Sequence, residues 1–137
     1  MKHSVKKITA KEAMAFFQDK SQRIGGLDPE NLHDDGLLFY ASGPVCGIAH
    51  YGFEEGVWMV HYGVKREGLG KYDGHMLSIL KEHWNAVKAK LIIGWTPESN
   101  KLALSIAKRI GFKVVGYLDL DDRIVMQEWK KGSNHGR

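Results

Sequence analysis

The sequence predicts a mixed α/β domain, in which a mostly antiparallel central sheet contains one parallel strand pair and carries helices on both faces. Short apolar, strand-like segments follow one another across tight turns, and a well-patterned helix separates two of them in mid-chain. A strand–helix–strand unit of this kind crosses over to pair in parallel. The length of 137 residues fits one domain, which we place at 1–131, followed by a disordered tail at 132–137.

The first part of the chain predicts a strand over 4–8 and a helix over 9–25. Thr9 can cap this helix, and Glu12 completes a capping box three residues later. Residues 25–36 are rich in turn formers, with Pro29 and three glycines. A hairpin of strands 37–42 and 45–53 turns at Gly43-Pro44, and 57–64 forms the next strand of the same meander.

The second half predicts a helix over 69–89, because apolar residues recur there at three- and four-residue steps. A strand over 90–96 follows, and Pro97 ends it. Asn100 can cap the next helix, which Gly111 ends. Strands 112–120 and 123–131 form a terminal hairpin.

Composition excludes several classes of protein. The single cysteine, Cys46, excludes an internal disulfide framework and a cysteine-rich zinc site. His75 and His83 lie too far apart in sequence to form a metal motif, so we expect no metal. No apolar run reaches the roughly 18 residues that would span a membrane, and no secretory signal is visible. We therefore expect a cytoplasmic protein with no membrane partner.

The net charge of +4 mildly favours an anionic ligand. The basic residues are spread along the chain, so nucleic acid is an unlikely partner and remains the weakest of three hypotheses.

A glycine-rich basic turn follows the strand over 57–64 and precedes the helix over 69–89. Free N–H groups at a helix start, together with the helix dipole, favour an anion there, and Lys65, Arg66 and Lys71 add charge. The spacing of the glycines fits neither of the two common nucleotide-binding loops. Leu69 follows Gly68 where a Walker A motif needs lysine, and a dinucleotide fingerprint needs glycine at 73.

Two stretches resemble motifs of the GCN5-related N-acetyltransferase superfamily. "VHYGVKREGLGK" (60–71) is similar to motif A, [QR]-x-x-G-x-[GA], with Gly68 and Gly70 in place and Val60 eight residues before the first glycine. Lys65 departs from the pattern at its first position. "NKLALSIAKRIGF" (100–112) resembles motif B. The order of elements over 4–131 also agrees, so the resemblance covers nearly the whole chain.

The resemblance implies an acyl-CoA N-acyltransferase fold that binds acetyl-coenzyme A. Its pyrophosphate would meet backbone amides at 66–71, and its pantetheine arm would run between strands 58–62 and 91–95, which would splay apart. A bulge near 60–62 would expose backbone to the thioester. The implied cofactor-binding residues are Val60, Tyr62, Val64, Lys65, Arg66, Glu67, Gly68, Leu69, Gly70, Lys71 and Asn100.

The sequence leaves the identity of the catalytic residues undecided. Ala107 stands where motif B usually carries the tyrosine that protonates the thiolate, so Tyr62, or else Tyr72 or Tyr117, is the alternative acid. His61 is the candidate base, because an imidazole titrates near neutral pH; a strand histidine packed in a polar cleft is the alternative that we prefer. The less favoured bases and the neighbouring cleft residues are Glu54, Glu55, His50 and Tyr51.

Two main hypotheses follow. The first is an N-acetyltransferase that transfers acetyl from acetyl-CoA to an unidentified small-molecule or peptide amine by direct attack. The second is a catalytically weak or inactive domain of the same fold, with a binding or structural role, for which a bacteriophage origin is one option. Residues 20–36 and the terminal hairpin would build the acceptor pocket, and a homodimer is an open alternative to a monomer.

Overall fold

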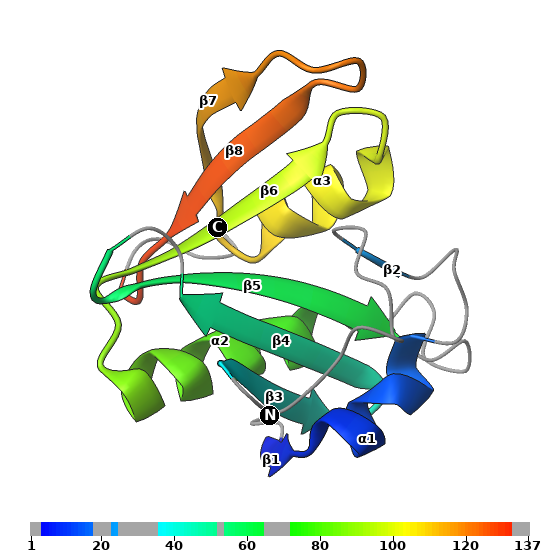
Figure 1. Cartoon of the computed structure of the whole chain (residues 1–137), viewed down its shortest axis with the longest axis vertical. Helices are drawn as coiled ribbons and strands as arrows, with labels where there is room; N and C mark the ends of the chain where they lie inside the picture. Colours follow the sequence, from blue (N-terminus) through cyan, green and yellow to red (C-terminus); the bar gives the residue numbers. More distant parts are fainter. Residues whose placement is uncertain (1–3, 18–22, 25–35, 52–53, 65–71, 133–137) are drawn as a thin grey trace.

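The computed structural model describes residues 4–17, 23–24, 36–51, 54–64 and 72–132. Within this part the strands form one sheet in the order β1-β3-β4-β5-β6-β8-β7, and β2 pairs with β5 off this path (Figure 1). The eight strands are β1 (Lys6–Ile8), β2 (Arg23–Ile24), β3 (Leu37–Ser42), β4 (Val45–Tyr51), β5 (Val57–Val64), β6 (Leu91–Pro97), β7 (Lys113–Leu118) and β8 (Ile124–Trp129).

The predicted mixed sheet is confirmed. All described neighbours pair antiparallel except β5 and β6, which pair in parallel. The helix α2 (Asp73–Val87) makes the crossover between them. It begins at Asp73 rather than at 69, and residues 65–71, which carry the glycine-rich turn, lie outside the described residues.

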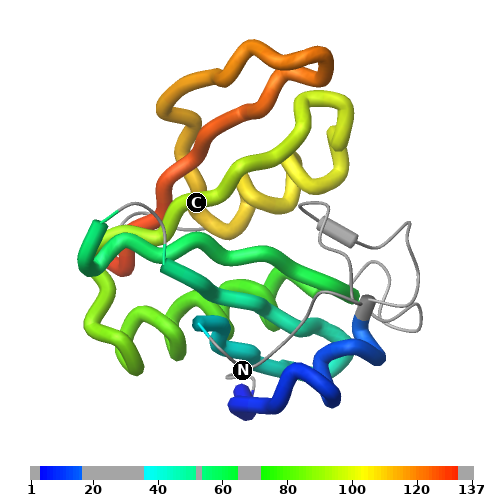
Figure 2. The backbone as a smooth tube through the Cα atoms, viewed as in Figure 1, coloured from blue at the N-terminus to red at the C-terminus, as the bar shows by residue number. Residues whose placement is uncertain are grey.

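Helices cover both faces of the sheet. The short α1 (Ala10–Ala13) and the 3₁₀ turn η1 (Met14–Phe17) pack with Phe39, Cys46 and Ile48. On the other face, α2 and α3 (Lys101–Arg109) pack against the alternate residues of β5 in the main apolar core. In Figure 2 the yellow-to-red chain of β6, α3, β7 and β8 forms the upper end of the molecule, and α1 and α2 lie in its lower half.

Residues 23–24 correct the prediction of a helix over 9–25. The described helical residues run to Phe17, and Arg23–Ile24 form β2 rather than helix. Their backbone pairs antiparallel with Gly63 and Tyr62 of β5. Ladder pairing with a distant strand thus decides the conformation here, since intrinsic helix propensity is only a weak local preference.

The predicted caps are confirmed, and they explain where two helices begin or end. The Thr9 hydroxyl accepts from the Glu12 N–H at 3.3 Å, and the Glu12 carboxylate accepts from the Thr9 N–H at 3.1 Å. The Asn100 side chain accepts from the Ala103 N–H at 3.1 Å and starts α3. After α3, Gly111 takes a φ of 108°, and the Phe112 N–H reaches the Ala107 carbonyl at 2.9 Å, as in a Schellman motif.

A buried polar pair lies under α2. The Tyr40 hydroxyl and His83 Nδ1 are 2.8 Å apart, and the His83 ring meets the Trp58 ring edge-on at 4.7 Å between centroids. His83 Nε2 is buried and has no hydrogen-bond partner among the described residues. Among the described residues, the Tyr40 hydroxyl is therefore the one hydrogen-bond partner that offsets the cost of burying the polar His83 ring.

We expect Tyr40→Phe to lower the free energy of unfolding by about 1–3 kcal/mol, because it leaves a second buried imidazole nitrogen unpaired. Urea denaturation at pH 7 measures the loss. Tyr51→Phe removes the same hydroxyl from an exposed ring and is the matched control. Equal small effects at both positions would contradict this account.

In the described residues, no helix combines the length and the apolar character that a membrane crossing requires.

Exposed apolar side chains gather along the edge strand β7 and the turn after it: Val114, Val115, Tyr117, Leu118 and Leu120. A homodimer stays a prediction.

Candidate functional site

The parallel ladder between β5 and β6 is short. It pairs Val57 with Leu91 and ends at Met59 with Ile93. Both strands continue beyond this point without pairing to each other, β5 to Val64 and β6 to Pro97. The two strands therefore part in the middle of the sheet, which can be followed in Figure 1 between the β5 and β6 arrows.

The free edge of β5 at this opening is limited by β2. Tyr62 and Gly63 pair with β2 on one side and with β4 on the other. Neither β6 nor β2 pairs with Val60 or His61 in the described part of the chain. These two residues therefore offer an open backbone edge, which an extended chain of amides could complete as an added strand.

A small cavity of about 40 Å³ lies at this opening, with room for about three water-sized groups. Its walls come from β5, β6, α2, α3 and β8, and they are mostly apolar, with small side chains on α3. The lining residues are Val60, His61, Tyr62, Met76, Gly94, Trp95, Thr96, Ala103, Ile106, Ala107, Ile110, Phe112 and Gln127.

The structure brings together only some of the predicted cofactor residues. Val60, His61 and Tyr62 line the cavity, whereas Val64 is buried in the core beyond it. The Asn100 side chain is bound to the first turn of α3 and does not line the cavity. The predicted contacts at 65–71 lie outside the described residues.

His61 is positioned by β5 on the face of the sheet that carries α1. Its neighbours Val60 and Tyr62 point into the core under α2, so the His61 side chain points the other way. There its Nε2 lies 3.1 Å from Nε2 of His50, on the adjacent β4, with the rings stacked. Burial, and then the nearby charge of His50, lowers the pKa of His61 from 6.5 to about 4. His61 is therefore neutral at neutral pH and able to accept a proton.

The candidate tyrosines are not free at the cavity. The Tyr62 hydroxyl donates to the Met76 carbonyl of α2 at 3.1 Å, and burial raises the pKa of Tyr62 well above 10. Tyr72 is buried in the core. Tyr117 lies on β7 under the Arg123 guanidinium, away from the cavity lining.

Ala107 lies in the cavity wall, held there by the Schellman turn that ends α3. No side-chain hydroxyl can come from this position. Glu54 and Glu55 are exposed in the turn before β5 and do not line the cavity, whereas the cavity wall includes His61.

One polar pair in the cavity wall was not anticipated. The Thr96 hydroxyl donates to the Gln127 side-chain carbonyl at 3.1 Å, and both residues are buried. Gln127 lies on the same buried face of β8 as Val125 and Trp129. A polar residue at an inward position of a strand is a signal that could have identified it.

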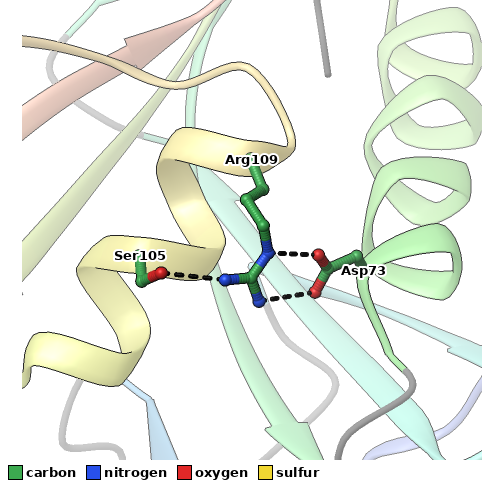
Figure 3. Close-up of polar contacts among 3 residues, drawn as sticks. All are labelled: Asp73, Ser105 and Arg109. Carbon is green, nitrogen blue, oxygen red and sulfur yellow. Dashed lines mark hydrogen bonds and ion pairs between the residues drawn. The ribbon is translucent and has the colours of Figure 1, made fainter. Parts of the chain in front are cut away.

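An exposed ion pair ties α2 to α3 beside the cavity (Figure 3). Arg109 donates from Nε and one terminal nitrogen to the Asp73 carboxylate at 2.5 and 3.1 Å, and from the other to Ser105 at 2.8 Å. Such an exposed pair contributes little to stability. It does join the first turn of α2 to the last turn of α3, and both helices line the cavity.

No family model matches the sequence, and no curated protein matches it either. Solved structures do match over nearly the whole chain. The aminoglycoside acetyltransferase AAC(6')-Ib, in complex with coenzyme A and kanamycin, superposes with a TM-score of 0.72 at 10% identity, covering 93% of this chain and 94% of that one.

Two further matches are of the same kind. The ribosomal-protein-S5-alanine acetyltransferase from Vibrio fischeri gives a TM-score of 0.71 at 10% identity, covering 97% of this chain and 95% of that one. A GNAT-family acetyltransferase from Bacillus anthracis gives 0.71 at 13% identity, covering 94% and 96%. The chain has the fold of the GNAT acetyltransferases, as the two sequence motifs predicted.

Proposed function

We propose that this chain is an N-acetyltransferase that uses acetyl-coenzyme A as donor and an amine as acceptor. One observation carries the proposal. Where the parallel ladder ends, the open backbone edge of Val60 and His61 meets an apolar cavity on the α2–α3 face, and the neutral imidazole of His61 lies on the α1 face. The same short segment of β5 thus provides a backbone edge that can bind the acetyl donor and a side chain that can accept a proton.

When bound, acetyl-coenzyme A would supply a thioester that an amine attacks directly. The backbone of Val60 and His61 suits its amide-containing arm, and the apolar cavity suits a small acyl group. By resemblance to motif A, the amides at 66–71 would hold its pyrophosphate. His61 would accept the proton that the amine loses.

The acceptor remains to be identified within the class of amines. Two of the similar structures are named for an aminoglycoside and for a ribosomal-protein alanine. A test panel should therefore contain an aminosugar and a peptide with an N-terminal alanine. Thiol release then reports turnover for each amine.

Calorimetric titration with acetyl-coenzyme A tests the donor site. We expect binding by the natural chain and no detectable binding by Gly68→Trp, because a bulky side chain would fill the predicted phosphate turn. Ala86→Trp adds the same bulk to the exposed last turn of α2 and is the matched control.

No binding by the natural chain at millimolar acetyl-CoA would remove the enzyme proposal. Binding that survives Gly68→Trp would instead show that the pyrophosphate lies elsewhere. Far-ultraviolet circular dichroism and thermal melting of both variants separate a lost site from a lost fold.

A second candidate is a coenzyme A-binding protein without turnover. It is favoured by the cavity wall, where Ala107 offers no hydroxyl and the Tyr62 hydroxyl is engaged with Met76. Tight donor binding with no thiol release across the amine panel would support this candidate over the enzyme.

A further inference from the structure

We propose that His50 is a positioning residue that fixes the tautomer of His61, so that Nδ1 of His61 is the atom that accepts the proton, and that His50 then shares this proton. The role in acetyl transfer rests on the proposed function. The tautomer itself does not, and it can be tested separately.

The two histidines meet across neighbouring strands. In the antiparallel register of β4 and β5, His61 lies opposite Ile48, and His50 lies opposite Met59. The two side chains are therefore diagonal neighbours on one face of the sheet. Their Nε2 atoms are 3.1 Å apart, and the rings are nearly parallel, at 12° and 5.2 Å between centroids.

The hydrogen bonds determine which nitrogens carry protons. Nδ1 of His50 lies 2.9 Å from the Tyr51 carbonyl oxygen, which can only accept, so Nδ1 of His50 is protonated. In neutral His50 the other nitrogen, Nε2, is then an acceptor. Nε2 of His61 must donate to it, which leaves Nδ1 of neutral His61 without a proton.

Nδ1 of His61 is also free to react. Among the described residues, no hydrogen bond engages this atom, and the His61 ring lies on the α1 face of the sheet, opposite to the Val60 and Tyr62 side chains at the cavity. His61 is thus held through Nε2, while Nδ1 remains available to an amine on the α1 face of the sheet. This arrangement of a base held by a third group is the logic of catalytic triads.

The proton transfer balances without any redox step. The N–H bond of the attacking amine breaks, and a bond from the proton to Nδ1 of His61 forms. The proton on Nε2 of His61 can then shift to Nε2 of His50, so that the positive charge passes to His50. Nδ1 of His61 retains the accepted proton and can return it to a leaving group.

The surroundings of His61 hold few other charges. Among the described titratable groups, His50 is the one whose charge acts on the pKa of His61, and burial has the larger effect. The α1–η1 segment, β4 and β6 supply no described carboxylate to the cavity lining. His50 is therefore the described group able to share the accepted charge.

Nuclear magnetic resonance on the full chain tests the tautomer directly. Long-range ¹H–¹⁵N correlations between pH 6 and 8 should show the Nε2–H form of His61 and the Nδ1–H form of His50. In His50→Gln the amide oxygen can replace the acceptor, so His61 should keep its tautomer. Its pKa should rise, yet stay below 6.5 because burial remains. An Nδ1–H form of His61 in the natural chain would overturn the proposal.

Turnover separates a hydrogen-bonding role from a packing role. His50→Phe keeps a stacked ring without nitrogen, whereas His50→Gln keeps an acceptor without a ring. We expect His50→Phe to lower kcat by about 10- to 1,000-fold and His50→Gln to lower it clearly less, with KM for acetyl-CoA unchanged in both.

Full activity of His50→Phe would overturn the proposal. If the chain binds no acetyl-CoA, the proposed function fails, while the resonance experiment still decides the tautomer.

Discussion

His61→Gln is expected to lower kcat for amine acetylation by about 10²- to 10⁴-fold at neutral pH, the range that a positioned general base contributes. The side chain is neutral there, because burial and the charge of His50 lower its pKa to about 4. Glutamine cannot accept a proton in its place. Donor affinity should change little, since Val60 and His61 present their backbone, not their side chains, to the donor edge.

Steady-state kinetics with the most active amine of the panel, together with calorimetric titration of acetyl-CoA, measure both quantities. Glu54→Gln and Glu55→Gln are matched controls, because these carboxylates are exposed in the turn before β5. Both should retain full activity. If either control loses as much activity as His61→Gln, the base has been assigned to the wrong residue.

Acid should destabilise the fold through two buried histidines. Burial lowers the pKa of His83 to about 4. Burial, together with the nearby charge of His50, also lowers the pKa of His61 to about 4. Below pH 6.5 the unfolded chain binds protons at these rings that the folded chain does not bind. Their contribution to stability is therefore complete above pH 6.5 and is lost as the pH falls through about 4.

Each ring should lower the free energy of unfolding by about 1.4 kcal/mol per pH unit in this window, and by roughly 3 kcal/mol in total. Urea denaturation at intervals from pH 7 to 4.5 measures the slope. His83→Gln keeps a polar partner for the Tyr40 hydroxyl but does not titrate, so its slope should be about half as steep. A slope that is flat, or that rises toward acid, would contradict this reading.

Much of the fold could be predicted because its signals are local. The capping box at Thr9 and Glu12, the Asn100 cap and the Gly111–Phe112 turn each depend on residues a few positions apart. The strand–helix–strand order likewise predicts the parallel pair β5–β6, because crossover connections have few alternatives. Strand β5 lies at its predicted bounds, 57–64.

The candidate site could be predicted only in part. The resemblance to the two acetyltransferase motifs placed Val60, His61 and Tyr62 at the opening, but it could not show that the Tyr62 hydroxyl is bound to Met76. The Thr96–Gln127 pair joins residues 31 positions apart. The segment at 23–24 was predicted as helix, but it forms a strand because its backbone pairs with β5.

The sequence by itself determined the order of the elements and their caps, because backbone propensity and side-chain periodicity act over a few residues. Tertiary structure decided the point where β5 leaves β6 and the meeting of His50 with His61. Both depend on strand register, in which a shift of one residue turns every side chain to the other face. That register is determined by the packing of the whole sheet, so neighbouring residues alone do not reveal it.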